Sequence, residues 1–183
     1  MNEGTEMKNM VFSNIVMKNV PRPIFMTFCQ QRASVDAPEE MFPMKAMHHF
    51  NFSNFIIDNR ELDKNSQIPI TGMPDNYITD IQLSDIQMVL PGGGTKEDAA
   101  KTDINEYTLE VLDGWWPEFI GVGTLPASGI YIRHVNDLYM NNIQIKTVSI
   151  DERPPIVLDD VLRHAANEIY SEGIELEDLV VIE

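Results

Sequence analysis

The chain has 183 residues, of which 43% are hydrophobic, and carries a formal net charge of −16. This length suits one domain with a sizeable core. The charge argues against binding to nucleic acids or anionic membrane surfaces, because phosphate binding requires clustered Lys and Arg. The single cysteine, Cys29, excludes an internal disulfide bond.

An eight-residue pattern recurs four times along the chain. In each copy, apolar residues two positions apart come before and after a polar pair that ends in Asn or Asp. Apolar residues at this spacing indicate strands with one buried face. Asn and Asp tolerate the left-handed backbone conformation that a tight bend requires. The copies are MVFSNIVM (Met10–Met17), FNFSNFII (Phe50–Ile57), IQLSDIQM (Ile81–Met88) and LYMNNIQI (Leu138–Ile145).

The recurrence predicts an all-β fold, a parallel β-helix in which the same bend is made once per coil. Stacked coils would bring Asn14, Asn54, Asp85 and Asn142 into one column, where side-chain amides can hydrogen-bond along the stack. A propeller is disfavoured, because its hairpins need Asn-Gly or Asp-Gly turns that these bends lack. A β-sandwich with chance similarity between strands remains the alternative fold.

The other predicted elements complete the coils. Residues 1–160 are expected to form the coils of a partial β-helix, interrupted by a long inserted loop at 91–127. Residues 161–183 are expected to form an acidic helical cap or tail. A short C-terminal helix is predicted because Leu162, Ala165, Ala166 and Ile169 make an apolar stripe, with Asp159 or Asp160 as its cap and Gly173 at its end. Further strands are predicted at Pro23–Phe28, Gly129–His134 and Pro154–Asp160.

Several long phrases resemble the polygalacturonase-like family, glycoside hydrolase family 28, and are most similar to its bacterial members that act on pectin side structures. The resemblance extends from Lys8 to Val161. It implies a right-handed parallel β-helix and a parent enzyme that hydrolyses uronic acid or rhamnose linkages in pectin with inversion. The phrases are FSNIVMKNVPRPIFMTFCQQR, LPGGGTKEDAA, GTLPASGIYIRHVNDLYMNNIQIKT and DERPPIVLDDV.

The catalytic motifs of that family are missing from the chain. The family uses Asn-Thr-Asp, Asp-Asp, Gly-His-Gly and Arg-Ile-Lys motifs. Here the only Asp-Asp pair, Asp159-Asp160, follows the last predicted rung, and the phrase Ile143–Lys146 lacks the Arg. The resemblance is therefore to the C-terminal part of such an enzyme only, and we expect the chain alone to be inactive, with no catalytic residue, cofactor or metal site.

The N-terminus lacks a basic start followed by an apolar run, so it is not expected to be a signal peptide. The localisation of this chain is thus left open, whereas the resemblance implies a secreted or periplasmic parent. No run of about 18 apolar residues predicts a membrane span.

Two adjacent tryptophans in the inserted loop are the first candidate for substrate binding. Trp115 and Trp116 lie in the phrase DGWWPEF. Aromatic faces can stack on the apolar faces of sugar rings, so this pair is predicted to wall a sugar cleft. The alternative is that the two rings pack the loop onto the coils.

A tyrosine and an arginine on one strand are the second candidate. If Ile130 and Ile132 point inward, Tyr131 and Arg133 are predicted to be exposed together on the sheet face. The guanidinium of Arg133 offers a bidentate site for a uronate carboxylate. The alternative is a structural Arg that ties one coil to the next.

Three hypotheses of function follow. The first is the C-terminal portion of a pectin-degrading glycosidase, with a pectic poly- or oligosaccharide as its partner. The second is a non-catalytic carbohydrate-binding or structural β-helix stub that self-associates through the uncovered first rung at Met10, Phe12 and Ile15. The third, an enzyme built on Asp159 and Asp160, is disfavoured because acids at a helix start are explained by capping.

Overall fold

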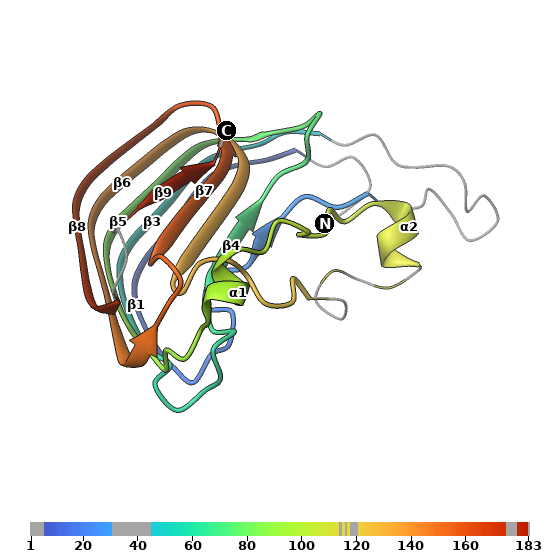
Figure 1. The fold of residues 1–183 in the computed structure, drawn as a ribbon. Helices are drawn as coiled ribbons and strands as arrows, with labels where there is room; N and C mark the ends of the chain where they lie inside the picture. The colour runs from blue at the N-terminus through green and yellow to red at the C-terminus, as the bar shows by residue number, and fades with distance from the viewer. Residues whose placement is uncertain are drawn as a thin grey trace.

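The fold is that of a computed structural model, which describes residues 6–30, 45–113, 115, 117, 121–174 and 179–182. The described residues form strands and two single-turn helices (Figure 1). The elements are β1 (Met7–Lys18), β2 (Met26–Thr27), β3 (Met47–Asp58), β4 (Ile68–Thr71), β5 (Ile78–Leu90), α1 (Lys96–Ala99), α2 (Leu109–Leu112), β6 (Ile130–Asp151), β7 (Ile156–Val161), β8 (His164–Ile174) and β9 (Val180–Ile182).

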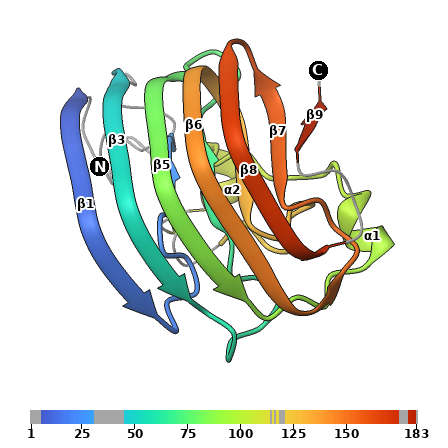
Figure 2. The ribbon, with the colours of Figure 1, turned by 90° about the vertical axis from the view of Figure 1, so that its left-hand side faces the viewer.

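The strands form one open sheet in which all of these strands pair in parallel. The long strands lie side by side in the order β1, β3, β5, β6, β8 (Figure 2). The short strands form a second row, in which β2 pairs with β4, and β7 pairs with β9. The first residues of β6 lie between β4 and β7 in this row, because β6 is 22 residues long and belongs to both rows. The predicted all-β class is confirmed.

The register of β1, β3, β5 and β6 is the one predicted from the repeated phrases. Met10 pairs with Phe50, Phe50 with Ile81, and Ile81 with Leu138. This register keeps the apolar residues at the first, third, sixth and eighth positions of every copy on the inner face, whereas the second and seventh positions, such as Val11 and Val16, face outward. The inner-face residues form the main core together with inward residues of the short strands, such as Ile70.

The predicted bend residues have left-handed backbone conformations. Asn14, Asn54, Asp85 and Asn142 have φ values of 59°, 58°, 54° and 53°. The Asn54 amide donates to Asn14 Oδ1 at 2.7 Å, and the Asn142 amide donates to Asp85 Oδ1 at 2.7 Å. Glu168 of β8 extends this column, with φ of 55°.

A second column of left-handed residues escaped the sequence analysis. It stands five positions before the first and comprises Asn9, His49, Asp80 and Asp137, with φ values of 59°, 61°, 56° and 61°. The long strands therefore bend at two places, and Figure 1 shows them curving together.

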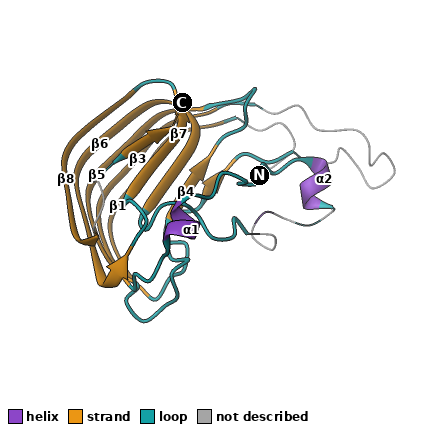
Figure 3. Ribbon diagram, in the orientation of Figure 1, coloured by secondary structure: helices purple, strands orange, loops and turns teal. Residues whose placement is uncertain are grey.

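The predicted C-terminal helix is wrong. The residues assigned to it lie in β7, in the turn at Leu162, and in β8, which pairs in parallel with β6 (Figure 3). A helix would place Leu162 and Ala166 on one apolar face. Instead Ala166 and Ile169 pack on the core, whereas Leu162 is 60% exposed. The strand prevails because the edge of β6 offers a complete ladder of backbone hydrogen-bond partners.

A buried ion pair attaches the segment after β5 to the sheet. Asp151 and Arg153 are fully buried, with Arg153 Nη2 2.8 Å from Asp151 Oδ2. Arg153 also donates to the carbonyls of Leu125 and Lys64, and the Gly94 amide donates to Asp151. Burial opposes ionisation of Asp151, but the hydrogen bonds from Arg153 outweigh it and lower the pKa of this carboxyl.

We predict that Asn142→Ala lowers the free energy of unfolding by about 1–2 kcal/mol, the cost of a left-handed conformation in a residue with a Cβ atom. Asn142→Gly should cost less, because glycine adopts this conformation freely and only the hydrogen bond to Asp85 is lost. Urea denaturation measures both variants. Asn141→Ala is the matched control, and an equal loss in all three would contradict the bend argument.

We further predict that Asp151→Ala lowers the free energy of unfolding by about 3–5 kcal/mol, because it leaves the Arg153 guanidinium buried without its counter-ion. Asp151→Ala combined with Arg153→Met should recover a large part of this loss. Since the pKa of Asp151 is lowered in the folded state, its contribution is present above the ordinary carboxyl range and lost as the pH falls through the lowered pKa. Denaturation at neutral and acidic pH tests both statements.

Candidate functional site

A cluster of charged and hydroxyl side chains lies where β6 and β7 run side by side. Arg133 and His134 on β6 pair in register with Asp159 and Asp160 on β7. The segment between β5 and β6 adds Glu106, and the turn before β5 adds Tyr77. We call this group the His134 cluster: Tyr77, Glu106, Tyr131, Arg133, His134, Asp159 and Asp160.

The His134 imidazole lies between two carboxylates. Its Nδ1 is 2.7 Å from Asp160 Oδ2, and its Nε2 is 3.3 Å from Glu106 Oε1. The residue is 5% exposed, and the Tyr77 ring meets it edge-on with centroids 5.8 Å apart. Each ring nitrogen of His134 thus faces a carboxylate, so the imidazole links β7 to the segment between β5 and β6.

His134 and Asp160, which pair in register, both have left-handed backbone conformations, with φ values of 51° and 53°. They therefore form a third bend, on the short-strand side of the stack. The bend directs both side chains toward Glu106 and Tyr77, which are brought in from other parts of the chain.

Arg133 ties the inserted segment to the sheet. Its Nη1 donates to the Ile104 carbonyl at 2.8 Å, and its Nη2 lies 3.6 Å from Glu106 Oε1. Its Nε is 3.2 Å from Asp159 Oδ2, an ion-pair distance without hydrogen-bond alignment. The guanidinium is thus surrounded by acceptors of the chain itself. This arrangement corresponds to the structural alternative named for Arg133, and its role in uronate binding stays a prediction.

Hydrogen bonds set the ionisation of the cluster. The hydroxyl of Tyr77 donates to Asp160 and, with His134, lowers the pKa of that carboxyl against the opposing effect of burial. The same bond raises the pKa of Tyr77 to about 12. Tyr131 donates to Asp159 Oδ2 at 2.5 Å, and burial followed by this bond raises the pKa of Tyr131. At neutral pH the tyrosines therefore stay protonated as donors.

The predicted exposure of Tyr131 is wrong, because the inserted segment covers this face of the sheet. Tyr131 is 0% exposed, and it packs with Val157 of β7 against a second core beneath the segment. Ile130 and Ile132 point inward as predicted. The members of this second core are Ile104, Tyr107, Leu112, Val122, Leu125, Ala127, Tyr131 and Val157.

The tryptophans are placed only in part. Trp115 follows α2, is 61% exposed, and donates its backbone amide to the Leu112 carbonyl at 2.7 Å. Trp116 lies outside the described residues. A sugar cleft between the two rings therefore stays a prediction.

The acidic pair has a different role from the one predicted. Asp159 and Asp160 were explained as caps of a helix, but they lie in β7 and face Arg133 and His134. A signal for this pairing is present in the sequence: IYIRHV at 130–135 and IVLDDV at 156–161 share the same apolar positions. Aligning these two phrases would have placed the basic pair beside the acidic pair.

No metal site is apparent in the described part of the chain, where no group of three or more His, Cys, Asp or Glu is arranged to hold an ion. Within the same residues, no helix is long and apolar enough to cross a membrane. No family model, curated protein or solved structure matches the chain.

We predict that Tyr77→Phe raises the pKa of Asp160 toward the ordinary carboxyl range, because it removes the hydrogen bond that contributes most to lowering it. The stabilisation from ionised Asp160 would then be lost at a higher pH on acidification. Carboxyl-carbon NMR titration measures the change. Tyr131→Phe, which removes the donor to Asp159, is the control, and an unchanged Asp160 titration in Tyr77→Phe would refute the assignment.

Proposed function

We propose that this chain forms C-terminal coils of a right-handed parallel β-helix like that of polygalacturonase-like glycosidases. The observation that carries the proposal is the common register of parallel strands, with left-handed residues at the same positions of every long strand. Right-handedness is supported by the strong preference of parallel crossover connections for that hand. The phrase resemblance from Lys8 to Val161 supports the family.

In this proposal the chain supplies a supporting and substrate-facing part of a pectin-degrading enzyme, while catalysis belongs to other coils. Each carboxylate of the His134 cluster is already engaged: Asp159 by Tyr131 and Arg133, Asp160 by Tyr77 and His134, and Glu106 by His134 and Arg133. Inverting glycosidases need two carboxyl groups about 6.5–9.5 Å apart with room for a water molecule between them. Because the His134 imidazole lies between Asp160 and Glu106, the geometry supports a structural role of the cluster over hydrolysis.

Binding of a pectic oligosaccharide without hydrolysis is the second candidate function. It is favoured by the 61% exposure of Trp115 on the inserted segment, since aromatic faces can stack on the apolar faces of sugar rings. The net charge of −16 repels a polygalacturonate backbone at long range. Weakly charged side-chain oligosaccharides are therefore the preferred ligands, and binding of charged ones should strengthen with salt.

We predict that the purified chain releases no reducing sugar from polygalacturonate or rhamnogalacturonan, because the acids of the His134 cluster are already engaged by side chains of the same chain. A colorimetric reducing-end assay measures the release. Activity that disappears in Asp160→Asn would contradict the proposal and favour the enzyme hypothesis built on the acidic pair.

We also predict that Trp115→Ala weakens binding of pectic oligosaccharides about three- to tenfold, if one ring contact contributes the roughly 0.5–1.5 kcal/mol of an aromatic pair. Isothermal titration calorimetry measures the affinity. Tyr139→Ala is the control, because Tyr139 is an exposed aromatic residue on β6, outside the inserted segment. Equal affinities of wild-type chain and Trp115→Ala would rule out this ring as a sugar contact.

A further inference from the structure

The stack of strands has two open ends with matching outlines. At one end, β1 and β2 each pair on one side only. At the other end, β8 and β9 do the same. Figure 2 shows β1 at one border of the sheet and β8 and β9 at the other. Each end thus presents one long and one short strand with unpaired edge groups, which are templates for further pairing.

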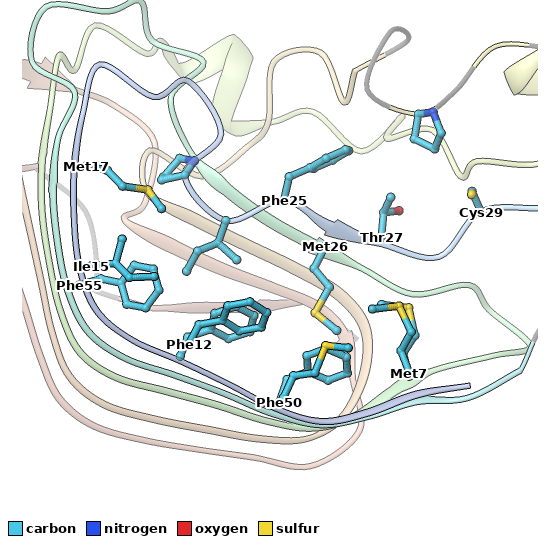
Figure 4. A pocket seen from close by; sticks show the side chains of 16 residues that line it. Met7, Phe12, Ile15, Met17, Phe25, Met26, Thr27, Cys29, Phe50 and Phe55 are labelled. Atoms are coloured by element: carbon cyan, nitrogen blue, oxygen red, sulfur yellow. The ribbon is translucent and has the colours of Figure 1, made fainter. Parts of the chain in front are cut away.

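The β1 end exposes the main core. An apolar hollow of about 670 Å³ opens there, lined by residues that include Met7, Met10, Phe12, Met26 and Phe50 (Figure 4). Phe12 stacks on Phe52 of the next strand, with ring centroids 5.1 Å apart, yet remains 39% exposed. Among the described residues nothing covers this apolar core end, and an exposed apolar surface of this kind marks an interaction site.

The β8 end is the complementary surface. Ala166 and Ile169 on the inner face of β8 are only partly buried against the core, as is Leu179 beside β9. On the outer face of β8, Tyr170 is 57% exposed. This end is acidic, with Glu168 and Glu172 on β8, whereas β1 carries Lys18; Lys8 of β1 is already paired with Glu6.

The two ends match in register as well as in charge. Following the paired positions along the stack, Glu168 occupies the place of Asn14, and Glu172 the place of Lys18. On the short-strand side, Val180 of β9 occupies the place of Phe25, next to β2. A second copy laid on β8 as the next rung would therefore align apolar with apolar residues and Lys18 with Glu172.

We propose that a second copy of this chain binds with its β1 end on the β8 end of the first, head to tail. The Asn column supports this polarity, because the amide of the later strand donates to the earlier one in both Asn54→Asn14 and Asn142→Asp85. Among the described residues, the Asn14 amide has a long contact to Ser13 Oγ, at 3.5 Å. In the stacked pair it donates to the Glu168 carboxylate of the neighbouring copy.

Lys18 and Glu172 keep their present ion-pair partners in the stacked pair. Lys18 lies 3.6 Å from Glu61, and Glu172 lies 2.7 Å from Lys146, so positive and negative side chains alternate across the contact. A face-to-face pairing of two β1 ends would instead leave the acidic β8 ends uncovered and would not continue the columns. The head-to-tail contact is heterologous and does not close, so it leads to open-ended stacks.

The inference concerns the 183-residue chain and does not depend on the proposed function. Further coils of a longer chain would use the same edges. The net charge of −16 opposes association, and screening over about 8 Å at physiological ionic strength reduces this repulsion. The assembly is therefore expected to strengthen between low and physiological salt.

Two blocked variants test the polarity by sedimentation velocity in 0.15 M NaCl. Val11→Asp with Val16→Asp blocks the β1 end, and Ala165→Asp with Tyr170→Asp blocks the β8 end. All four residues are exposed, so the fold should tolerate the changes. Gln82→Asp with Gln87→Asp is the matched control, because these residues occupy the same two columns in the middle of the stack.

The wild-type chain and the control should form species that grow with concentration. Each blocked variant alone should sediment as a monomer, and a mixture of the two should form a species of about twice the 20.8 kDa chain mass, and none larger. A dimer formed by the β8-blocked variant alone would overturn the proposal in favour of β1-to-β1 pairing. A monomeric wild-type chain at all concentrations would overturn it entirely.

Discussion

Stacking of left-handed bend residues in register is the constraint on which the rest of this structure depends. A residue with a Cβ atom loses about 1–2 kcal/mol in this conformation, and only Asn and Asp offset part of that cost with their own side chains. Here Asn54 and Asn142 do so by donating to the neighbouring strand. Because every long strand bends at the same place, the apolar residues at equivalent positions on the inner faces all point into one core.

The second determinant is the segment between β5 and β6. Its placement depends on the buried Asp151–Arg153 pair, which Gly94 approaches so closely that an added Cβ would lie 1.9 Å from Arg153 Nε. The segment covers one face of β6 and β7, buries Tyr131, and delivers Glu106 to His134. This buried ion pair thus helps to position Glu106, the one acid of the His134 cluster that does not lie in β7.

The properties that build the fold also account for its proposed interactions. A parallel strand always leaves its outer edge ready for another strand of the same direction, so a stack is complete only where something covers its ends. In this chain the β1 end is apolar and the β8 end is acidic and half covered. The proposed head-to-tail contact and the proposed place within a longer β-helix use the same edges for the same physical reason.

The sequence by itself determined the repeated parts of β1, β3, β5 and β6, their register and the bend at Asn14, Asn54, Asp85 and Asn142, because a spacing of two around a polar pair is a local signal. The segment that contains Ala166 and Ile169 fits a helix and a strand equally well, and only the free edge of β6 decided for a strand. The burial of Tyr131 and the meeting of His134 with Glu106 and Asp160 were decided by the tertiary structure as well. These contacts join residues 26 to 28 positions apart, and their formation depends on how the chain between them packs.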